Sequence, residues 1–288
     1  MTTIQHRTGT KQHRGAVRIA AIIPARMASS RFPGKSLLDV DGLPMVEHVR
    51  RRAARCRGFS NVVVATCDDE IQRAIESYGG RCVMTAPTHP MASDRVAEAM
   101  QQLDCTHVVN IQGDEILVLP SDLDRMVEAI RANPTVPAWN AVAKIEDATE
   151  LSDRAIVKCV LSVSGRMMYC TRDCSRFAQL LAPSFEPLRE VLGVLGFRRE
   201  FLERFGRLAR TPLELAESMD QSRIVEHDVE FRTVEFSRGY PGINEPKDVV
   251  LIRRYLEKDP AQRAMLAEIL REPAPTPVAG RRAVTRVA

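Results

Sequence analysis

The chain of 288 residues is poor in aromatic side chains, which make up 5% of it and include one tryptophan, Trp139. Its core therefore has to be built mainly from Val, Ile, Leu, Ala and Met. No apolar run approaches the ~20 residues that a membrane-spanning helix needs. The basic N-terminal stretch lacks the apolar segment of a secretory signal. We therefore expect a cytoplasmic protein without a membrane partner.

Paired cysteine motifs are also missing. The seven cysteines include no pair at CxxC spacing, and Cys170 and Cys174, four residues apart, have no histidine near them in the sequence. An odd, scattered set indicates reduced thiols rather than a disulfide framework or a zinc site.

Acidic residues are absent before Asp39, although the net charge of the whole chain is only +4. So small a net charge does not indicate a nucleic-acid partner. Residues 1–17 are expected to form a disordered basic extension. The cations Arg26, Arg31 and Lys35 lie close together after an apolar segment, and this arrangement favours a site for a concentrated anion such as a triphosphate.

Short apolar strands alternate with helices in the first half of the chain. The predicted strands are 19–23, 61–66, 81–85 and 106–111, and the predicted helices are 44–57, 68–76 and 93–103. This alternation predicts an α/β fold with a parallel sheet. Ligands bind such sheets at the carboxyl ends of the strands, so the loops 24–35 and 112–115 should face one crevice.

The pattern changes after Asn140. Strands are predicted at 156–163, 166–170 and 229–234, and helices at 212–223 and 246–257, while 188–198 is apolar and punctuated by glycine. Residues 272–288 are rich in Pro, Arg and Ala, a composition typical of a disordered tail.

The loop 24–35 carries the chemistry expected of a triphosphate site. Arg26 and Arg31 can each offer a planar fork to phosphate oxygens, and Lys35 can offer a point charge. A GxxxxGK[ST] motif is absent, so the loop is not a P-loop. Asp114 follows a predicted buried strand and could bind Mg²⁺, although a solvated turn acid or a helix cap would also fit that position.

Three segments resemble the CMP-KDO synthetases (3-deoxy-manno-octulosonate cytidylyltransferases). They are IIPARMASSRFPGK (22–35), VVNIQGDE (108–115) and GINEPKDV (242–249), and further matches lie at 156–172, 191–197 and 211–223. The resemblance covers about residues 18–257. It implies a Rossmann-like nucleotidyltransferase fold with a mostly parallel central sheet and a smaller dimerisation lobe. It also implies CTP, Mg²⁺ and a homodimer, with a cytidylyltransferase domain over 18–271 and a lobe at about 155–225 for acceptor and dimer contacts.

The resemblance also implies roles for individual residues. Arg26, Ser29, Arg31 and Lys35 match the triphosphate loop, Asp114 matches a metal ligand, and Gln112 would lie at the cytosine or acceptor end. The remaining positions expected to bind substrate are Arg95, Asp220, Gln221 and Arg223.

Some positions depart from the family pattern. Asn244 stands where the family has an aspartate that is its second metal ligand, and the neighbouring Glu245 is an alternative ligand. Val191 and Leu195 replace a His-x-x-x-Tyr pair that contacts the sugar, and 91–95 reads MASDR instead of SGTER. Loss of an imidazole and a phenol removes hydrogen-bond partners for a polyhydroxylated sugar.

These observations predict transfer of CMP from CTP to a small acidic acceptor with release of pyrophosphate. The acceptor could be a phosphonate such as phosphonoformate, or a KDO-like keto-acid sugar. A sugar-phosphate nucleotidylyltransferase and a non-catalytic nucleotide-binding paralogue are the alternatives. No catalytic histidine is expected, and His89 is the nearest candidate for one.

Overall fold

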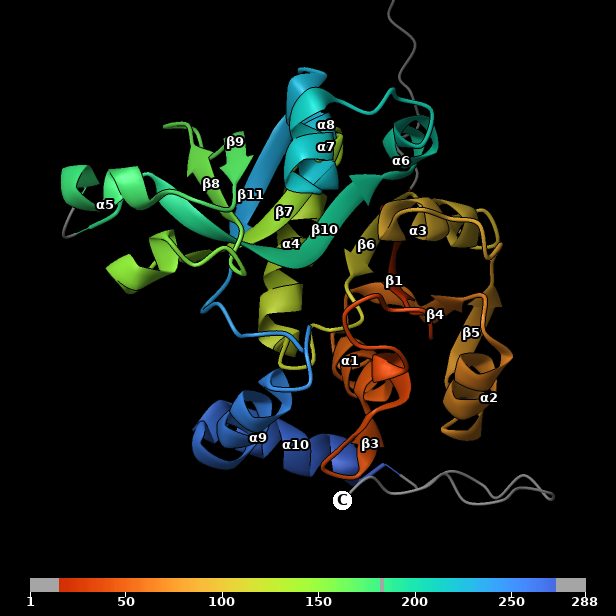
Figure 1. The fold of residues 1–288 in the computed structure, drawn as a ribbon. Helices are drawn as coiled ribbons and strands as arrows, with labels where there is room; N and C mark the ends of the chain where they lie inside the picture. Colours follow the sequence, from red (N-terminus) through yellow and green to blue (C-terminus); the bar gives the residue numbers. More distant parts are fainter. Residues whose placement is uncertain (1–15, 182–183, 273–288) are drawn as a thin grey trace, which may run out of the picture.

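The computed structural model describes residues 16–181 and 184–272. Within them, nine strands form one sheet in the order β11-β7-β10-β6-β1-β4-β5, with β8 and β9 branching from β10 (Figure 1). The strands of this sheet are β1 (Ile19–Pro24), β4 (Phe59–Thr66), β5 (Arg81–Met84), β6 (His107–Ile111), β7 (Ala138–Lys144), β8 (Lys158–Leu161), β9 (Met167–Thr171), β10 (Leu188–Arg198) and β11 (Phe231–Glu235). A separate two-stranded sheet consists of β2 (Asp39–Val40) and β3 (Leu43–Pro44).

Helices cover both faces of the large sheet. The helices of the described residues are α1 (Met45–Ala53), α2 (Asp69–Ser77), α3 (Ala92–Met100), α4 (Pro120–Ala132), α5 (Ser175–Leu181), α6 (Arg199–Phe205), α7 (Pro212–Glu217), α8 (Asp220–Glu226), α9 (Asp248–Lys258) and α10 (Pro260–Leu270), with 3-10 turns η1 (Lys35–Leu37) and η2 (Ala148–Leu151). Apolar side chains of α1, α2 and α4 pack on one face, and those of α3, α6 and α8 on the other. Because β1 is buried on both faces, all six of its residues are buried and its sequence is uniformly apolar.

The predicted parallel sheet is confirmed in the first half of the chain. Strand β1 pairs in parallel with both β4 and β6, and β4 pairs in parallel with β5. The carboxyl ends of β1 and β6 therefore lie side by side. This places the loop 24–35 next to the loop 112–115, as the sequence predicts.

Strand β10 runs antiparallel between β6 and β7. Its first residues, Leu188 to Glu190, also pair with β8, which forms a hairpin with β9. The hairpin lies beside β11, and α5 extends outward from this part of the molecule (Figure 1). The hairpin and α5 lie within the predicted lobe at 155–225.

The prediction of one continuous helix over 212–223 is wrong. The structure has two short helices, α7 and α8, in its place. The chain breaks at Ser218, which has a left-handed conformation with φ of 54°. The carboxylate of Glu226 in α8 accepts hydrogen bonds from the free backbone N–H groups of Leu213 and Glu214 at the start of α7. The two helices thereby pack as a pair instead of continuing as one rod.

The C-terminal helices α9 and α10 pack against α1, far from them in sequence (Figure 1). Buried Arg52 of α1 donates to Gln262 Oε1 at 2.8 Å, and Arg55 forms ion pairs with Glu268 and Glu272, both at 2.7 Å. The chain between β11 and α9 consequently passes close to the loop 24–35.

Most of both predicted terminal extensions, 1–17 and 272–288, lies outside the described residues. Within residues 16–181 and 184–272, no helix is long and apolar enough to cross a membrane.

Candidate active site

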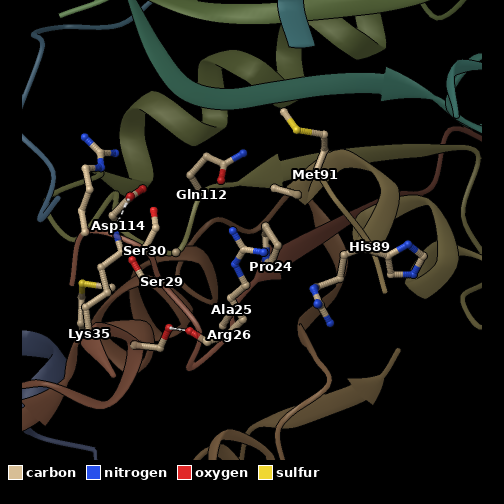
Figure 2. A pocket seen from close by; sticks show the side chains of 16 residues that line it. Pro24, Ala25, Arg26, Ser29, Ser30, Lys35, His89, Met91, Gln112 and Asp114 are labelled. Carbon is tan, nitrogen blue, oxygen red and sulfur yellow. Dashed lines mark hydrogen bonds and ion pairs between the residues drawn. The ribbon is translucent and has the colours of Figure 1, made fainter. Parts of the chain in front are cut away.

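A pocket opens at the carboxyl ends of β1 and β6 (Figure 2). Four segments line it: the loop after β1, the start of α1, the loop and first turn around the start of α3, and the loop after β6. The predicted site residues that line it are Arg26, Ser29, Arg31, Lys35, Arg95, Gln112 and Asp114. Residues distant in sequence thus meet at one edge of the sheet.

Backbone hydrogen bonds give the loop after β1 its shape. The N–H of Gly34 donates to the carbonyl of Met27 at 2.9 Å, and the N–H of Met27 donates to Asp68 Oδ2 at 2.8 Å. Gly34 has a φ of 78°, a left-handed conformation that glycine adopts without steric cost. The hydroxyl of Ser36 donates to the carbonyl of Arg26 at 3.0 Å. The bonds that fix the loop therefore engage its backbone, and none of them uses its cationic side chains.

Two of the three cations pair with the two predicted metal ligands. Lys35 Nζ donates to Asp114 Oδ2 at 2.7 Å, a contact drawn as a dashed line in Figure 2. Arg31 Nη2 donates to Asn244 Oδ1 at 2.9 Å. Arg26 is exposed in the pocket, and its guanidinium has no hydrogen-bond or ion-pair partner in the described part of the chain. One strong cation is thus available to an incoming anion, and two more are held by groups that a metal ion would engage.

The segment before α9 completes this side of the pocket. Lys35 Nζ also donates to the carbonyl of Ile243 at 2.7 Å. The carboxylate of Asp248 accepts the backbone N–H groups of Asn244 and Glu245, both at 2.8 Å. Asp248 therefore fixes the backbone that presents Asn244.

The oxygen atoms at this edge fit a magnesium ion. Mg²⁺ is usually bound by one or two carboxylates together with waters and substrate phosphates. Asp114 supplies a carboxylate and Asn244 an amide oxygen, and Lys35 links the Asp114 side chain to the backbone next to Asn244. Among residues 16–181 and 184–272, no cluster of three or more His, Cys, Asp or Glu could bind a metal by itself. These two side chains would therefore need phosphate oxygens and water to complete the coordination.

Arg95 and Gln112 also line the pocket. Arg95 is 3% exposed, and its guanidinium donates to the hydroxyl of Thr85 and, at 3.4 Å, to Cys67 Sγ. The backbone N–H of Gln112 donates to the carbonyl of Gly193 at 2.8 Å, while its side chain lies at the pocket (Figure 2). Both residues are held in place by groups outside the pocket.

Three other predicted substrate-binding residues do not line this pocket. Asp220 accepts a hydrogen bond from Ser93, and its burial raises its pKa. Arg223 forms a buried ion pair with Glu214 and lies 4.6 Å from the centre of the Phe205 ring. Gln221 donates to Asn140 Oδ1 at 3.4 Å. These side chains connect α8 to its neighbours.

Val191 and Leu195, the apolar replacements on β10, also lie outside the pocket lining. Leu195 is 2% exposed and belongs to the core on the α3 side of the sheet, and Val191 packs at the edge of that core. The pairing of β10 with β7 shifts register between these two residues.

The structure adds pocket residues that sequence reasoning did not select. Ser30, Ser36, Met45, His89 and Met91 all line it. His89 Nε2 bonds to Glu98 Oε2, which also accepts the N–H of Ala86 at 2.9 Å, so α3 fixes the loop that bears the imidazole. His89 could have been selected from the sequence, because it lies just before the MASDR segment. The sequence does not mark Met45 as a pocket residue, because Met45 begins a helix after a separate small sheet.

The sequence and the fold match known cytidylyltransferases. A model of the cytidylyltransferase family matches residues 20–231. The 3-deoxy-manno-octulosonate cytidylyltransferase of Geobacter sulfurreducens is 38% identical over 249 residues, which are 83% of this chain and 98% of that protein. The Escherichia coli enzyme of the same name is 32% identical over 243 residues, or 84% and 98% of the two chains.

A solved structure is similar as well. CMP:2-keto-3-deoxy-manno-octonic acid synthetase complexed with CTP has a TM-score of 0.77 and 30% identity to this chain, covering 84% of it and 99% of the synthetase. The family match spans most of the sheet and both pocket loops, in agreement with the resemblance of the sequence motifs. The chain therefore belongs to the cytidylyltransferase family of nucleotidyltransferases.

Proposed function

We propose that this pocket transfers CMP from CTP to a small acidic acceptor and releases pyrophosphate. The observation that carries the proposal is the meeting of Arg26, Arg31, Lys35 and Asp114 at one pocket from two separate loops. The similar synthetase structure contains CTP, which supports the same nucleotide here.

In this reaction an acceptor oxygen attacks the α-phosphorus of CTP, either from a phosphonate oxyanion or from a sugar hydroxyl whose proton passes to water. A new oxygen–phosphorus bond forms, the bond from the α-phosphorus to the α–β bridging oxygen breaks, and its electron pair leaves with pyrophosphate. Arg26 would bind the triphosphate first, because its guanidinium has no partner to release among the described residues. Arg31 and Lys35 would stabilise the charge that accumulates on the leaving pyrophosphate. Ser29 lies in the same loop and would donate to a phosphate oxygen.

Magnesium is the proposed cofactor, with Asp114 and Asn244 as the residues that would bind it. When bound, it would neutralise phosphate charge and polarise the α-phosphate. Asn244 contributes an oxygen without a charge, and Glu245 beside it forms an ion pair with Lys247 at 2.9 Å. Asn244 is thus the better placed of the two, since its side chain already reaches Arg31 in the pocket.

The acceptor end would consist of Arg95, Gln112 and the loop bearing His89. Arg95 provides a fixed cation for the acid group of the acceptor. Asp220, Gln221 and Arg223 would support this end indirectly through α8, since their side chains bond to protein groups. His89 is not proposed as a general base, because its Nε2 is engaged by Glu98.

Two acceptors are supported by different observations. The relatives are named as 3-deoxy-manno-octulosonate cytidylyltransferases, which favours KDO or a similar keto-acid sugar. Val191 and Leu195 replace the His and Tyr that the resemblance implies for sugar contacts, which favours a smaller, less hydroxylated acid such as phosphonoformate. Both side chains lie outside the pocket lining, so they would act through the shape of β10 rather than by direct contact.

The test is pyrophosphate release from CTP and Mg²⁺ with a panel of KDO, neuraminate-type keto acids, phosphonoformate and simple phosphonates. Release with KDO alone supports the sugar, and release with a phosphonate but not KDO supports the second acceptor. Turnover of UTP or dTTP with a sugar phosphate would instead indicate a sugar-phosphate nucleotidylyltransferase. CTP binding without turnover of any acceptor would favour a non-catalytic paralogue.

We further propose a cytoplasmic homodimer that forms through the lobe. Large apolar side chains are exposed on this part of the surface, among them Val163, Met168, Tyr169 and Phe177. Contiguous exposed apolar surface is typical of an interaction site. Analytical ultracentrifugation of the wild type and of Tyr169→Glu tests this, with a monomeric wild type as the contrary result.

A further inference from the structure

Strand β10 is distorted beside the proposed active site. Its pairing with β7 joins Val191 to Val142 and Leu195 to Asn140, so β10 advances four residues while β7 advances two. Such a bulge redirects the strand and its side chains. The buried side chain of Asn140 donates to the carbonyl of Leu192 at 2.9 Å, which satisfies a carbonyl within the bulge.

The other edge of the bulge is bonded to the loop that carries Asp114. The regular β10–β6 pairing ends at Val194 and Ile111. One residue further, the N–H of Gln112 donates to the carbonyl of Gly193 at 2.8 Å. The N–H of Gly193 in turn donates to Glu115 Oε1 at 2.7 Å. Glu115 thus continues the strand pairing with its side chain after the backbone of the loop has turned away.

The contact between Glu115 and Gly193 leaves no space for a side chain on the strand. A Cβ at position 193 would lie 2.5 Å from Glu115 Oε1 and 2.9 Å from Gln112 Cγ. A glycine is therefore required for this approach, and the carboxyl group packs directly on the strand backbone. Val191 and Leu195 lie on either side of this glycine, so its position determines theirs.

We infer that Glu115 is a positioning residue that fixes strand β10 relative to the Asp114 loop. Its backbone follows that of Asp114 directly, while its side chain holds Gly193 in the bulge. The role rests on the proposed function, because it links the residue proposed to bind the metal with the strand that bonds to Gln112 at the proposed acceptor end. The triphosphate loop has its own hydrogen bonds and does not depend on this contact.

Removal of the contact should separate the two substrates kinetically. Glu115→Ala should lower kcat/KM for the acceptor about 100-fold, since a displacement of about 1 Å can cost that much, while the Kd of CTP changes less than about threefold. Glu115→Gln keeps an oxygen that accepts the Gly193 N–H, so it should rescue turnover to within about threefold of the wild type.

A second variant covers the possibility that Glu115→Ala does not fold. Gly193→Ala should produce the same kinetic pattern from the opposite side of the contact. Combined with Glu115→Ala, it should add little further loss, because both changes remove one interaction. Losses that simply multiply in the double variant would contradict the inference.

Asp122→Ala is the matched control. Asp122 is also a buried carboxylate and accepts the N–H and hydroxyl of Ser237 at 2.8 and 2.7 Å, but no hydrogen bond or ion pair links it to β10 in the described structure. It should lower stability without the acceptor-specific loss. An equal acceptor-specific loss in Asp122→Ala, or wild-type turnover in Glu115→Ala, would overturn the inference.

Amide hydrogen exchange at Gly193 tests the hydrogen bond between Gly193 and Glu115 without any measurement of turnover. Exchange should become faster in Glu115→Ala and stay slow in Glu115→Gln. Unchanged exchange in Glu115→Ala would contradict the inference even if no acceptor is found. Absence of turnover in the wild type, by contrast, would count against the proposed function alone.

Discussion

The pocket and helix α8 use their polar side chains differently. In the pocket, Arg26, Arg31 and Lys35 extend from a loop whose shape is maintained by backbone hydrogen bonds, so their charges face the pocket. In α8, outside the pocket lining, the side chains of Asp220 and Arg223 are buried in bonds to Ser93 and Glu214. Residues that match a family motif can therefore line the pocket in one segment and connect elements of the fold in another.

The largest effect is expected at Asp114, which pairs with Lys35 in the pocket and is proposed to bind the metal. Asp114→Asn should lower kcat by about 1,000-fold, because the proposed metal ligand loses its charge where phosphate charge must be neutralised. Its melting temperature should stay near the wild-type value, since the partly exposed pair with Lys35 contributes little to stability.

Pyrophosphate release and thermal unfolding measure the two effects in Asp114→Asn. Asp104→Asn is the control, because it removes another ion-paired carboxylate, 2.6 Å from Arg18, at the amino edge of the sheet. Substantial activity in Asp114→Asn would show that this carboxylate is not a metal ligand.

The next largest effect should be on the stability of the α7–α8 pair. Arg223→Met leaves the buried carboxylate of Glu214 with the exposed Arg210 as its remaining ion-pair partner in the described structure, and should cost about 3 kcal/mol of unfolding free energy. Arg210→Met removes the exposed partner of the same carboxylate and should cost less than about 1 kcal/mol. Urea unfolding measures both. A raised acceptor KM at unchanged stability in Arg223→Met would instead make Arg223 a direct ligand.

Acid should lower the free energy of unfolding through His48 in α1. Burial lowers the pKa of His48 in α1 to about 4, so the folded protein favours the neutral imidazole. Stability is therefore fully present above the unfolded pKa near 6.5 and is lost as the pH falls toward 4. Between pH 8 and 5 the loss from this group is about 2 kcal/mol.

This loss is measured as the difference in unfolding free energy between the wild type and His48→Gln across that pH range. His227→Gln is the control, since that histidine is exposed and bonds only to the carbonyl of Ala209. An identical pH dependence in the wild type and His48→Gln would show that His48 is protonated without cost.

The smallest effect should come from Arg26. Arg26→Ala should raise the Kd of CTP about tenfold, the contribution of one charge-assisted hydrogen bond to phosphate, and leave the acceptor KM unchanged. Arg81→Ala removes an exposed cation from β5, outside the pocket, and should have no effect. Isothermal titration with CTP distinguishes them. Equal affinity of Arg26→Ala and wild type would show that the paired cations alone bind the triphosphate.

The first half of the fold could be predicted because its signals are local. Strands β1, β4 and β6 are short apolar runs bounded by polar loops, and their parallel order places the two pocket loops together. The break at Ser218 could not be predicted in this way, since it depends on Glu226 reaching back to the start of α7. Strand β10 cannot be assigned from its sequence, because Gly193 fits close packing against Gln112 and Glu115 that only the folded chain reveals.

In the candidate site, too, the features with local sequence signals could be predicted and the long-range contacts could not. Arg26, Lys35 and Asp114 could be identified because each directly follows a buried strand in a motif. The pairing of Lys35 with Asp114 and of Arg31 with Asn244 joins segments about 80 and 210 residues apart, and no spacing rule predicts it. For the same reason the bonds that engage Asp220 and Arg223 could not be read from their motif.

The pairing of Lys35 and Arg31 with Asp114 and Asn244 has a consequence for product inhibition. Each cation would have to leave its oxygen partner before it could bind a free anion, so an empty site should retain inorganic phosphate or metal-free pyrophosphate weakly. A nucleotide bound to magnesium would replace both sides of each pair at once. Its phosphates would bind the two cations, and its metal ion would bind the oxygens of Asp114 and Asn244. We therefore expect pyrophosphate to inhibit turnover more strongly as its magnesium salt than as the free anion, which would keep the resting enzyme clear of the phosphate ions around it.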